Sequence, residues 1–401
     1  MLEDTLFTDD RRQTTDDRRQ TTDDRRQTTD DRRQIKPFNN KMNLLKAFGI
    51  IAVVGGHCGI NFLPWFPPYS YHMPLFIFIS GYFFHDKTFI AFLKSKVKHL
   101  VIPLLTWNII FGLLCIILLH YGLIAFVGRP TLHAFLLDPF LHGHQFVFNL
   151  ATWFVGTLVE IQILYWALHR ACRGNQIAIT FVSLICYLAA WYMGDRHWHQ
   201  SYGFVMLAAE KVLFSLIFYQ MGYIYSAFFE KLDSFSVNRI ILLIIFNGIL
   251  MGYGNRSLTT GIAWMNVPHR FFLTLLTAMS GIYLLLQVSE LLKDKVDRNS
   301  LLGYIGENTF SIMTLHLFFF WLLNTLFMVL KNYQLFPLRS FDYNKYMHSI
   351  WFRVTEHSPM NDAFYFIAGI GGSLVCVYLY DRYKHVVVEI FKKITVKRAT
   401  I

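Results

Sequence analysis

The sequence predicts an all-α, polytopic membrane protein with about ten transmembrane helices. Of its 401 residues, 54% are hydrophobic, 17% are aromatic and only 16% are charged. A soluble domain of this size needs a surface in which about a quarter of the residues are charged, and this chain lacks one. Its apolar residues instead form runs of about 18 to 25 residues between short polar links, which is the length that crosses a hydrocarbon layer of roughly 30 Å.

The transmembrane domain is predicted to cover residues 42–385, between two polar ends. We expect spans at 42–60, 70–87, 99–127, 151–169, 176–194, 205–227, 238–253, 271–292, 306–330 and 362–381. Outside the N-terminal repeat, Lys and Arg then lie mainly on the side that holds both termini, so the positive-inside rule places both termini in the cytoplasm. The formal charge of +11 therefore comes mostly from Lys and Arg that set the orientation of the spans, and it does not indicate nucleic-acid binding. The longer outer segments, 128–150 and 331–361, are candidates for a substrate vestibule, and residues 386–401 for a basic cytoplasmic tail.

Residues 1–41 are predicted to be a disordered arm. Residues 8–34 repeat the heptapeptide Thr-Thr-Asp-Asp-Arg-Arg-Gln, in which no position is apolar, so the repeat has neither a coiled-coil seam nor a core to bury. Codons for this period can be written as a tandem heptanucleotide, in which gain or loss of one copy shifts the reading frame. We therefore hypothesise that the repeat is a phase-variation switch of expression. Met42 is available as an internal start.

Four of the ionisable side chains within the predicted spans stand out, because each is costly there and is therefore a functional candidate; His72 and Lys211 are weaker candidates. In MNLLKAFGIIAVVGGHCG, Lys46 and His57 are eleven residues apart, which is close to three helical turns and puts both on one face. Glycines beside His57 allow another backbone or a ligand to approach. Glu160 must be protonated or paired, and a carboxylate can orient His57 as a base. His316 lies deep in the ninth span. The alternative is a snorkelling Lys and histidines that only pack between helices.

Other polar residues are weaker candidates. His72 and Ser80 lie in YHMPLFIFISGYFF, where the Ser80-Gly81 pair also predicts a tight contact between helices. In KSKVKHLVIP, Lys96 and Lys98 lie at the predicted cytoplasmic end of the third span. There they can bind the phosphates of a nucleotide-bearing donor or only lipid head groups. The five cysteines are scattered without C-x-x-C spacing, so neither a metal site nor a disulfide framework is expected.

These stretches together resemble the acyltransferase 3 family of integral-membrane acyltransferases, and especially its fucose 4-O-acetylase-like branch. LLKAFGIIAVVGGH is similar to the family's first helix, in which a basic residue is followed after ten residues by His. YHMPLFIFISGYFF resembles its Phe-His-Met-Pro…Ser-Gly-Tyr helix, LVEIQILYW its Val-Glu-x-Gln helix, and IGENTFSIMTLH its penultimate helix. The resemblance runs in order over about 42–385.

The resemblance implies roles for individual residues. It implies that His57 is the essential catalytic histidine, that Lys46 is its basic partner in the motif, and that Glu160 is the buried acid. Lys96 and Lys98 stand where the family has an Arg-rich motif linked to acyl-CoA, and Lys cannot reproduce Arg's bidentate fork. We therefore take His57 and Glu160 as catalytic candidates, and the three lysines as donor-binding candidates.

The resemblance also implies a function. It implies an O-acetyltransferase of the bacterial inner membrane, with acetyl-CoA as donor and no metal. The acceptor would be a hydroxyl of a cell-surface polysaccharide or of a lipopolysaccharide sugar, such as O-antigen, and His72, Ser80 and His316 are candidates for substrate binding. The alternative is a multi-pass transporter or flippase of a glycan or small polar substrate, because buried His and Glu and helix-breaking glycines also suit translocation.

Overall fold

The computed structural model describes residues 38–63, 66–125, 130–141, 146–254, 258–335, 341–355 and 360–384. Over these residues the chain is helical and forms no strand; its one β element is the isolated bridge between Gly261 and Asn266. The predicted all-α class is therefore confirmed for the described part of the chain. Nearly all of the predicted arm and the whole tail of residues 386–401 lie outside it.

Seven helical segments among the described residues are long and apolar enough to cross a membrane. They are Phe89–His120, Val147–Ala171, Gln176–Asp195, Phe204–Leu232, Phe271–Leu292, Thr309–Asn332 and Met360–Lys384. The other three predicted spans coincide with α2 (Asn40–Cys58), α3 (Pro68–Tyr82) and the shorter apolar helix α12 (Val237–Tyr253). A multi-pass membrane protein is thus supported with seven candidate spans, while the count of about ten and the cytoplasmic termini stay predictions.

The remaining helices follow in chain order. They are α4 (Phe89–Lys96), the π-helix η2 (Val97–Val101), α5 (Ile102–His120), α6 (Leu132–Leu136), α7 (Asp138–Leu141), the 3-10 helix η3 (Val147–Thr152), α8 (Trp153–Ala171), α9 (Gln176–Asp195), α10 (Trp198–Tyr202), α11 (Phe204–Ile224), the π-helix η4 (Tyr225–Phe229), the 3-10 helices η5 (Glu230–Leu232) and η6 (Ile262–Trp264), α13 (Phe271–Leu292), α14 (Leu301–Glu307), α15 (Thr309–Asn332), α16 (Tyr343–His348), α17 (Met360–Ile367) and the π-helix η7 (Ala368–Gly372).

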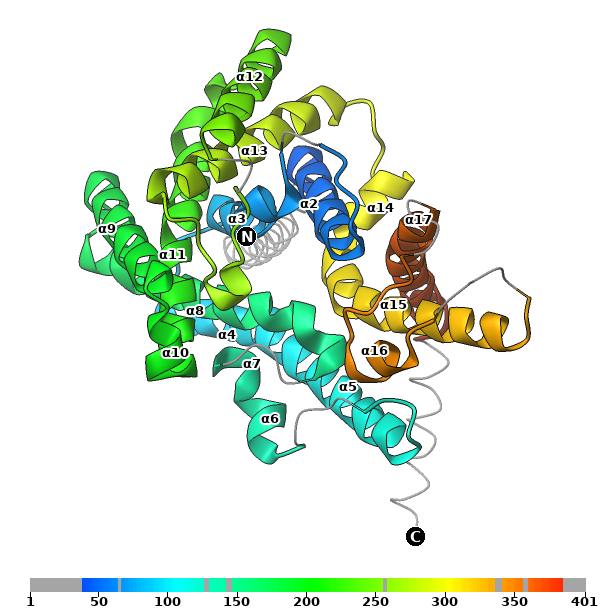
Figure 1. Ribbon diagram of the computed structural model, residues 1–401. Coiled ribbons are helices and arrows are strands. Elements are labelled where there is room, and N and C mark those ends of the chain that lie inside the picture. The colour runs from blue at the N-terminus through cyan, green and yellow to red at the C-terminus, as the bar shows by residue number, and fades with distance from the viewer. Residues whose placement is uncertain are drawn as a thin grey trace, which may run out of the picture. The chain divides into compact units, whose positions relative to one another are not determined.

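Figure 1 shows α2 and α3 side by side, with α11 and α13 next to α3, and with α14 and α15 next to α2. α2 is buried along nearly its whole length, as expected for a helix that is hydrophobic on every face. By contrast, α12 exposes a row of large apolar side chains, including Ile241, Leu242 and Ile245, which is what a lipid-facing helix needs. The first predicted span is therefore the inner helix of the bundle.

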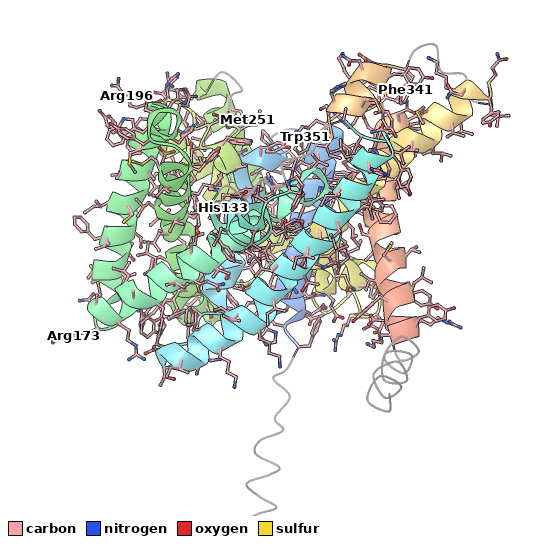
Figure 2. The ribbon with its side chains drawn as sticks, turned by 90° about the horizontal axis from the view of Figure 1, so that it is seen from below. His133, Arg173, Arg196, Met251, Phe341 and Trp351 are labelled. Carbon is pink, nitrogen blue, oxygen red and sulfur yellow. The ribbon has the colours of Figure 1, made fainter. Side chains whose placement is uncertain are left out.

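Most of the loops fall on two sides of the helices. Figure 2 shows Arg196, Met251, Phe341 and Trp351 toward one side, Arg173 toward the other, and His133 of the predicted outer segment 128–150 between them. Apart from His133, this grouping agrees with the predicted one, in which Arg173 is cytoplasmic and the other four lie at or beyond the outer ends of their spans. The assignment of the two sides to cytoplasm and exterior stays a prediction.

A close contact between α3 and α11 surrounds Ser80. A Cβ atom at Gly81 would meet the carbonyl oxygen of Tyr219, and one at Gly222 would meet the carbonyl oxygen of Phe78. Small residues therefore let the two backbones touch. The tight helix contact predicted at the Ser80-Gly81 pair is confirmed.

A buried polar network holds the beginning of α2. Lys41 Nζ donates to Tyr225 Oη over 2.7 Å and lies 3.0 Å from Glu290 Oε2, and its side chain is only 6% exposed. The compact unit begins at Asn40. A chain that started at Met42 would lack this ion pair, so the residues just before Met42 belong to the folded domain.

Candidate active site

Two histidines that are far apart in sequence meet beside α2. His57 lies on the last turn of α2, and His316 lies within α15. His57 Nδ1 is 2.8 Å from His316 Nε2, and the two rings are stacked with their centroids 5.0 Å apart. His316 is fully buried, whereas His57 is half-buried. His57 of the first predicted span and His316 of the ninth therefore form a hydrogen-bonded pair.

The hydrogen bonds determine which nitrogen of each ring carries the proton. His316 Nδ1 is 3.0 Å from the carbonyl oxygen of Ile312, and a carbonyl only accepts, so His316 Nδ1 donates. A neutral imidazole has one donor and one acceptor nitrogen, so His316 Nε2 accepts, and His57 Nδ1 donates to it. The lone pair of neutral His57 is then on Nε2, which is the nitrogen that can act as a base.

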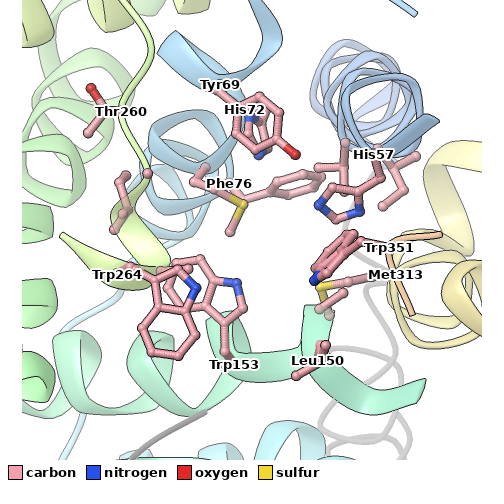
Figure 3. A pocket seen from close by; sticks show the side chains of 17 residues that line it. His57, Tyr69, His72, Phe76, Leu150, Trp153, Thr260, Trp264, Met313 and Trp351 are labelled. Atoms are coloured by element: carbon pink, nitrogen blue, oxygen red, sulfur yellow. The ribbon is translucent and has the colours of Figure 1, made fainter. Parts of the chain in front are cut away.

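His57 lines a cavity of about 190 Å³ between the helices. Figure 3 shows His57 and Trp351 on one side of this cavity and Trp153 and Trp264 on the other. The indole of Trp351 stands edge-on to the imidazole of His57, with the centroids 5.3 Å apart. The cavity is lined by Ile50, Val53, His57, Tyr69, His72, Met73, Phe76, Leu150, Ala151, Trp153, Thr260, Gly261, Ile262, Ala263, Trp264, Met313 and Trp351.

Two segments predicted to lie on the outer side each contribute a residue to this lining. Leu150 comes from the predicted outer segment 128–150, and Trp351 from the segment 331–361. The first of these segments is packed against helices: Asn108 of α5 donates to the backbone of α6, and Phe148 is fully buried. Both segments therefore reach the cavity, in keeping with the predicted vestibule.

An arginine from the second of these segments holds the end of α2. Gly59 ends the helix with φ +87°, a left-handed conformation that glycine adopts without strain. Arg353 Nη1 donates to the carbonyl oxygen of Cys58 and lies 3.2 Å from Asp362 Oδ1. This clamp fixes the last turn of α2, which carries His57. Sequence reasoning missed Arg353 and Trp351, because nothing in a loop sequence indicates which helix it will reach.

Glu160 does not contact the histidine pair. It acts electrostatically with Lys211 of α11, and within the described structure neither Glu160 Oε2 nor Lys211 Nζ makes a hydrogen bond. Lys211 Nζ lies 5.4 Å from the ring of Trp153, one of the cavity walls. The expectation that Glu160 orients His57 is wrong, because His57 Nδ1 bonds to His316 instead. A catalytic role for Glu160 stays a prediction.

The other candidates divide between the cavity and its surroundings. His72 lines the cavity, and its Nδ1 donates to the carbonyl oxygen of Pro68. Ser80 of α3 accepts from Nε2 of Gln162 on α8 over 2.6 Å. Of the candidates, His57 and His72 line the cavity and His316 supports His57, while Lys46, Ser80, Lys96, Lys98 and Glu160 are not in its lining.

The three lysines lie apart from the histidines. Lys46 is half-buried on α2 and acts electrostatically with Glu307. Lys96 Nζ lies 5.2 Å from the ring of Phe92, and Lys98 is exposed on η2. Their roles in donor binding stay predictions. Among the described residues there is no group of three or more His, Cys, Asp or Glu that could hold a metal ion.

Comparison with protein families decides what kind of protein carries this site. A family model of acyltransferase 3, described as an acyltransferase domain, matches residues 39–382. The chain belongs to the acyltransferase 3 family. The matched range of this acyltransferase includes every helix from α2 to α17, and the family membership favours the acyltransferase interpretation over the transporter. No curated protein and no solved structure matches the chain, and the fucose 4-O-acetylase-like branch stays a prediction.

Proposed function

We propose that this acyltransferase moves an acyl group, most simply acetyl, from acyl-CoA to a hydroxyl of a cell-surface polysaccharide or lipopolysaccharide sugar. The observation that carries the proposal is that His57 lines the cavity while its Nδ1 bonds to His316, an arrangement that leaves the lone pair of the neutral ring on Nε2. The membrane-embedded helices are in keeping with a donor made in the cytoplasm and an acceptor outside.

His57 acts as a general base in this proposal. Its Nε2 takes the proton from the acceptor hydroxyl while the hydroxyl oxygen attacks the thioester carbonyl. The C–O bond forms, the C–S bond breaks, and the proton passes from His57 to the departing sulfur, so the product is an ester and a free thiol. General-base assistance of this kind typically contributes about 10² to 10⁴ in rate.

His316 is a positioning residue for this step. When His57 takes up a proton, its Nδ1–H still donates to His316 Nε2, and that bond stabilises the imidazolium that forms. Because Ile312 holds His316 Nδ1–H, the pair keeps one arrangement of protons. A carboxylate plays the corresponding part in serine hydrolase triads.

The size of the cavity limits what it can hold. A protein cavity of about 150 Å³ holds a benzene molecule, so a cavity of about 190 Å³ admits groups of about that size, such as the thioester and the reacting edge of a sugar. The body of the donor must therefore lie outside it. Lys46, Lys96 and Lys98 remain the candidates for its phosphates, since phosphate groups are commonly bound by cationic side chains.

The experiment compares His57→Ala and His57→Gln with the parent protein, purified in nanodiscs and supplied with acetyl-CoA and surface glycan. Mass spectrometry follows acetyl transfer. Both variants are expected to lose at least about a hundredfold in rate, following the usual worth of a general base. His120→Ala, at the exposed end of α5, is the control. Transfer by His57→Ala at the parent rate, with equal amounts of folded protein, would refute the role.

A further inference from the structure

We propose that Phe76 limits the length of the acyl group, so that the site accepts acetyl and excludes butyryl and longer chains. The inference rests on the proposed function and narrows its donor to a short-chain acyl-CoA. Phe76 lies on α3 about one helical turn beyond His72, and no sequence motif assigned this role to it.

Contacts between α2 and α3 show that the two helices run antiparallel beside the cavity. A Cβ atom at Gly56, near the end of α2, would meet the ring of Tyr69 at the start of α3. A Cβ atom at Gly49, in the middle of α2, would meet the ring of Phe76. Phe76 therefore lies nearer than Tyr69 to the N-terminal end of α2.

Contacts of α14 and α15 show that α15 runs parallel to α2. Asn43, near the start of α2, donates to the carbonyl oxygen of Gly303 on α14, which directly precedes α15. His57, near the end of α2, bonds to His316 of α15. Met313 comes about one turn before His316, so it also lies toward the N-terminal end of α2.

The cavity is therefore lined only by apolar side chains in the direction that leads from the histidines toward the N-terminal end of α2. We call this part of the lining the apolar end. It consists of Ile50, Val53, Met73, Phe76 and Met313. None of these side chains contains a nitrogen or an oxygen atom, so the apolar end offers no hydrogen bond to a ligand.

Phe76 closes the apolar end and is held there by neighbouring helices. A Cβ atom at Gly49 would lie 3.0 Å from Cζ of Phe76, so the ring reaches from α3 to the backbone of α2. The ring of Phe154 on α8 also packs against it, with the centroids 6.0 Å apart. Because closely packed side chains yield little to added volume, the Phe76 ring sets a fixed limit.

The acyl chain is the part of the substrates that suits this end. The acceptor carries hydroxyls and the pantetheine arm of CoA carries amides, and both are unfavourable where no hydrogen-bond partner is present. A hydrocarbon chain is favoured there, because it leaves water for an apolar surface. The buried ammonium of Lys211 bears on another wall, since it lies 5.4 Å from the ring of Trp153, which Figure 3 shows across the cavity from His57.

The volume of the cavity sets the length of the chain. Its volume of about 190 Å³ is only slightly larger than the roughly 150 Å³ of a cavity that holds benzene. The thioester and the attacking hydroxyl take up part of this space beside His57. The acyl chain then has room for its first methyl group and little more.

The first test is a series of donors. The full-length protein in nanodiscs receives acetyl-, propionyl-, butyryl- or hexanoyl-CoA and surface glycan from cells that lack the gene, and mass spectrometry follows acyl transfer. One methylene in a hydrophobic pocket is worth about 10- to 200-fold, so kcat/KM for butyryl-CoA should be at least about a hundredfold below that for acetyl-CoA. Equal values would overturn the inference and leave the proposed function standing. No transfer of any acyl group would overturn the proposed function and this inference with it.

The second test shortens the side chain of Phe76. In Phe76→Ala the ratio of kcat/KM for butyryl-CoA to that for acetyl-CoA should rise at least about tenfold, the lower worth of one methylene, and Phe76→Leu should fall between this variant and the parent. The ratio does not depend on the amount of folded protein, and a residue that only supports the fold would lower both values alike.

Phe318→Ala is the matched control, because Phe318 is a half-buried phenylalanine of α15 that does not line the cavity. Its ratio should equal that of the parent, even if its melting temperature falls. An unchanged ratio in the Phe76 variants, or the same rise in Phe318→Ala, contradicts the assignment.

Discussion

The hydrogen bond between the two histidines can be tested by replacing His316. His316→Phe keeps an aromatic ring against His57 but removes the acceptor, so His57 Nδ1–H is left buried without a partner. The bond is 2.8 Å long, and it is worth about 0.5–1.5 kcal/mol while His57 is neutral but about 1.5–3 kcal/mol once His57 carries the proton. The transition state therefore loses about 1–1.5 kcal/mol more than the ground state, and at about 1.4 kcal/mol for each factor of ten in rate kcat should fall by about 5- to 15-fold.

A second variant separates this hydrogen bond from simple packing. In His316→Gln the amide oxygen can accept from His57 Nδ1–H, so we expect it to be clearly more active than His316→Phe. Acetyl transfer to the glycan is measured at saturating acetyl-CoA, and heat denaturation checks that both variants are folded. If the Phe variant keeps more than about half of the parent kcat, or if the two variants are equally slow at equal stability, the tautomer argument is refuted.

Three further predictions concern the framework of the site. A chain that starts at Met42 lacks Lys41 and its charged hydrogen bond, worth about 1.5–3 kcal/mol, while Glu290 keeps Lys293 as a partner; it should melt at a lower temperature than a chain that begins two residues earlier, and equal melting would contradict the network. Gly81→Ala pushes a methyl group into the carbonyl of α11 and should destabilise the protein by about 1–3 kcal/mol. Gly252→Ala, where the added methyl group meets nothing within 4 Å, is its control and should have little effect in the same denaturation assay. Arg353→Gln loses a charged hydrogen bond that pins the end of α2, worth about 1.5–3 kcal/mol, and should lower both kcat and the melting temperature; a variant with parent-like kcat would show that the clamp does not position the base.

Much of the fold is visible in the sequence because lipid imposes simple rules. A helix that crosses a bilayer must satisfy its backbone hydrogen bonds internally, so long apolar runs directly give helices, and every predicted span has one in the structure. The same rules made His57 and His316 conspicuous, since an ionisable group within such a run is costly. The Ser80-Gly81 contact followed from the small size of its residues.

The sequence did not show which of the buried ionisable side chains would pair with His57. Glu160 was the obvious carboxylate for orienting His57, yet it acts electrostatically with Lys211, while a second imidazole occupies the place beside His57. Chemical complementarity alone favours an acid for an imidazole and cannot show which helix faces which. The family match to residues 39–382 likewise fixes the kind of chemistry without locating the cavity.

The sequence by itself thus determined a helical membrane acyltransferase with a histidine inside its first helix, because hydropathy and local motifs are properties of neighbouring residues. Only the tertiary structure decided that His316 supports His57, that Arg353 pins the helix end, and that Phe76 and three indoles line the cavity. These residues lie on segments far apart in the chain, and their meeting depends on how the helices pack.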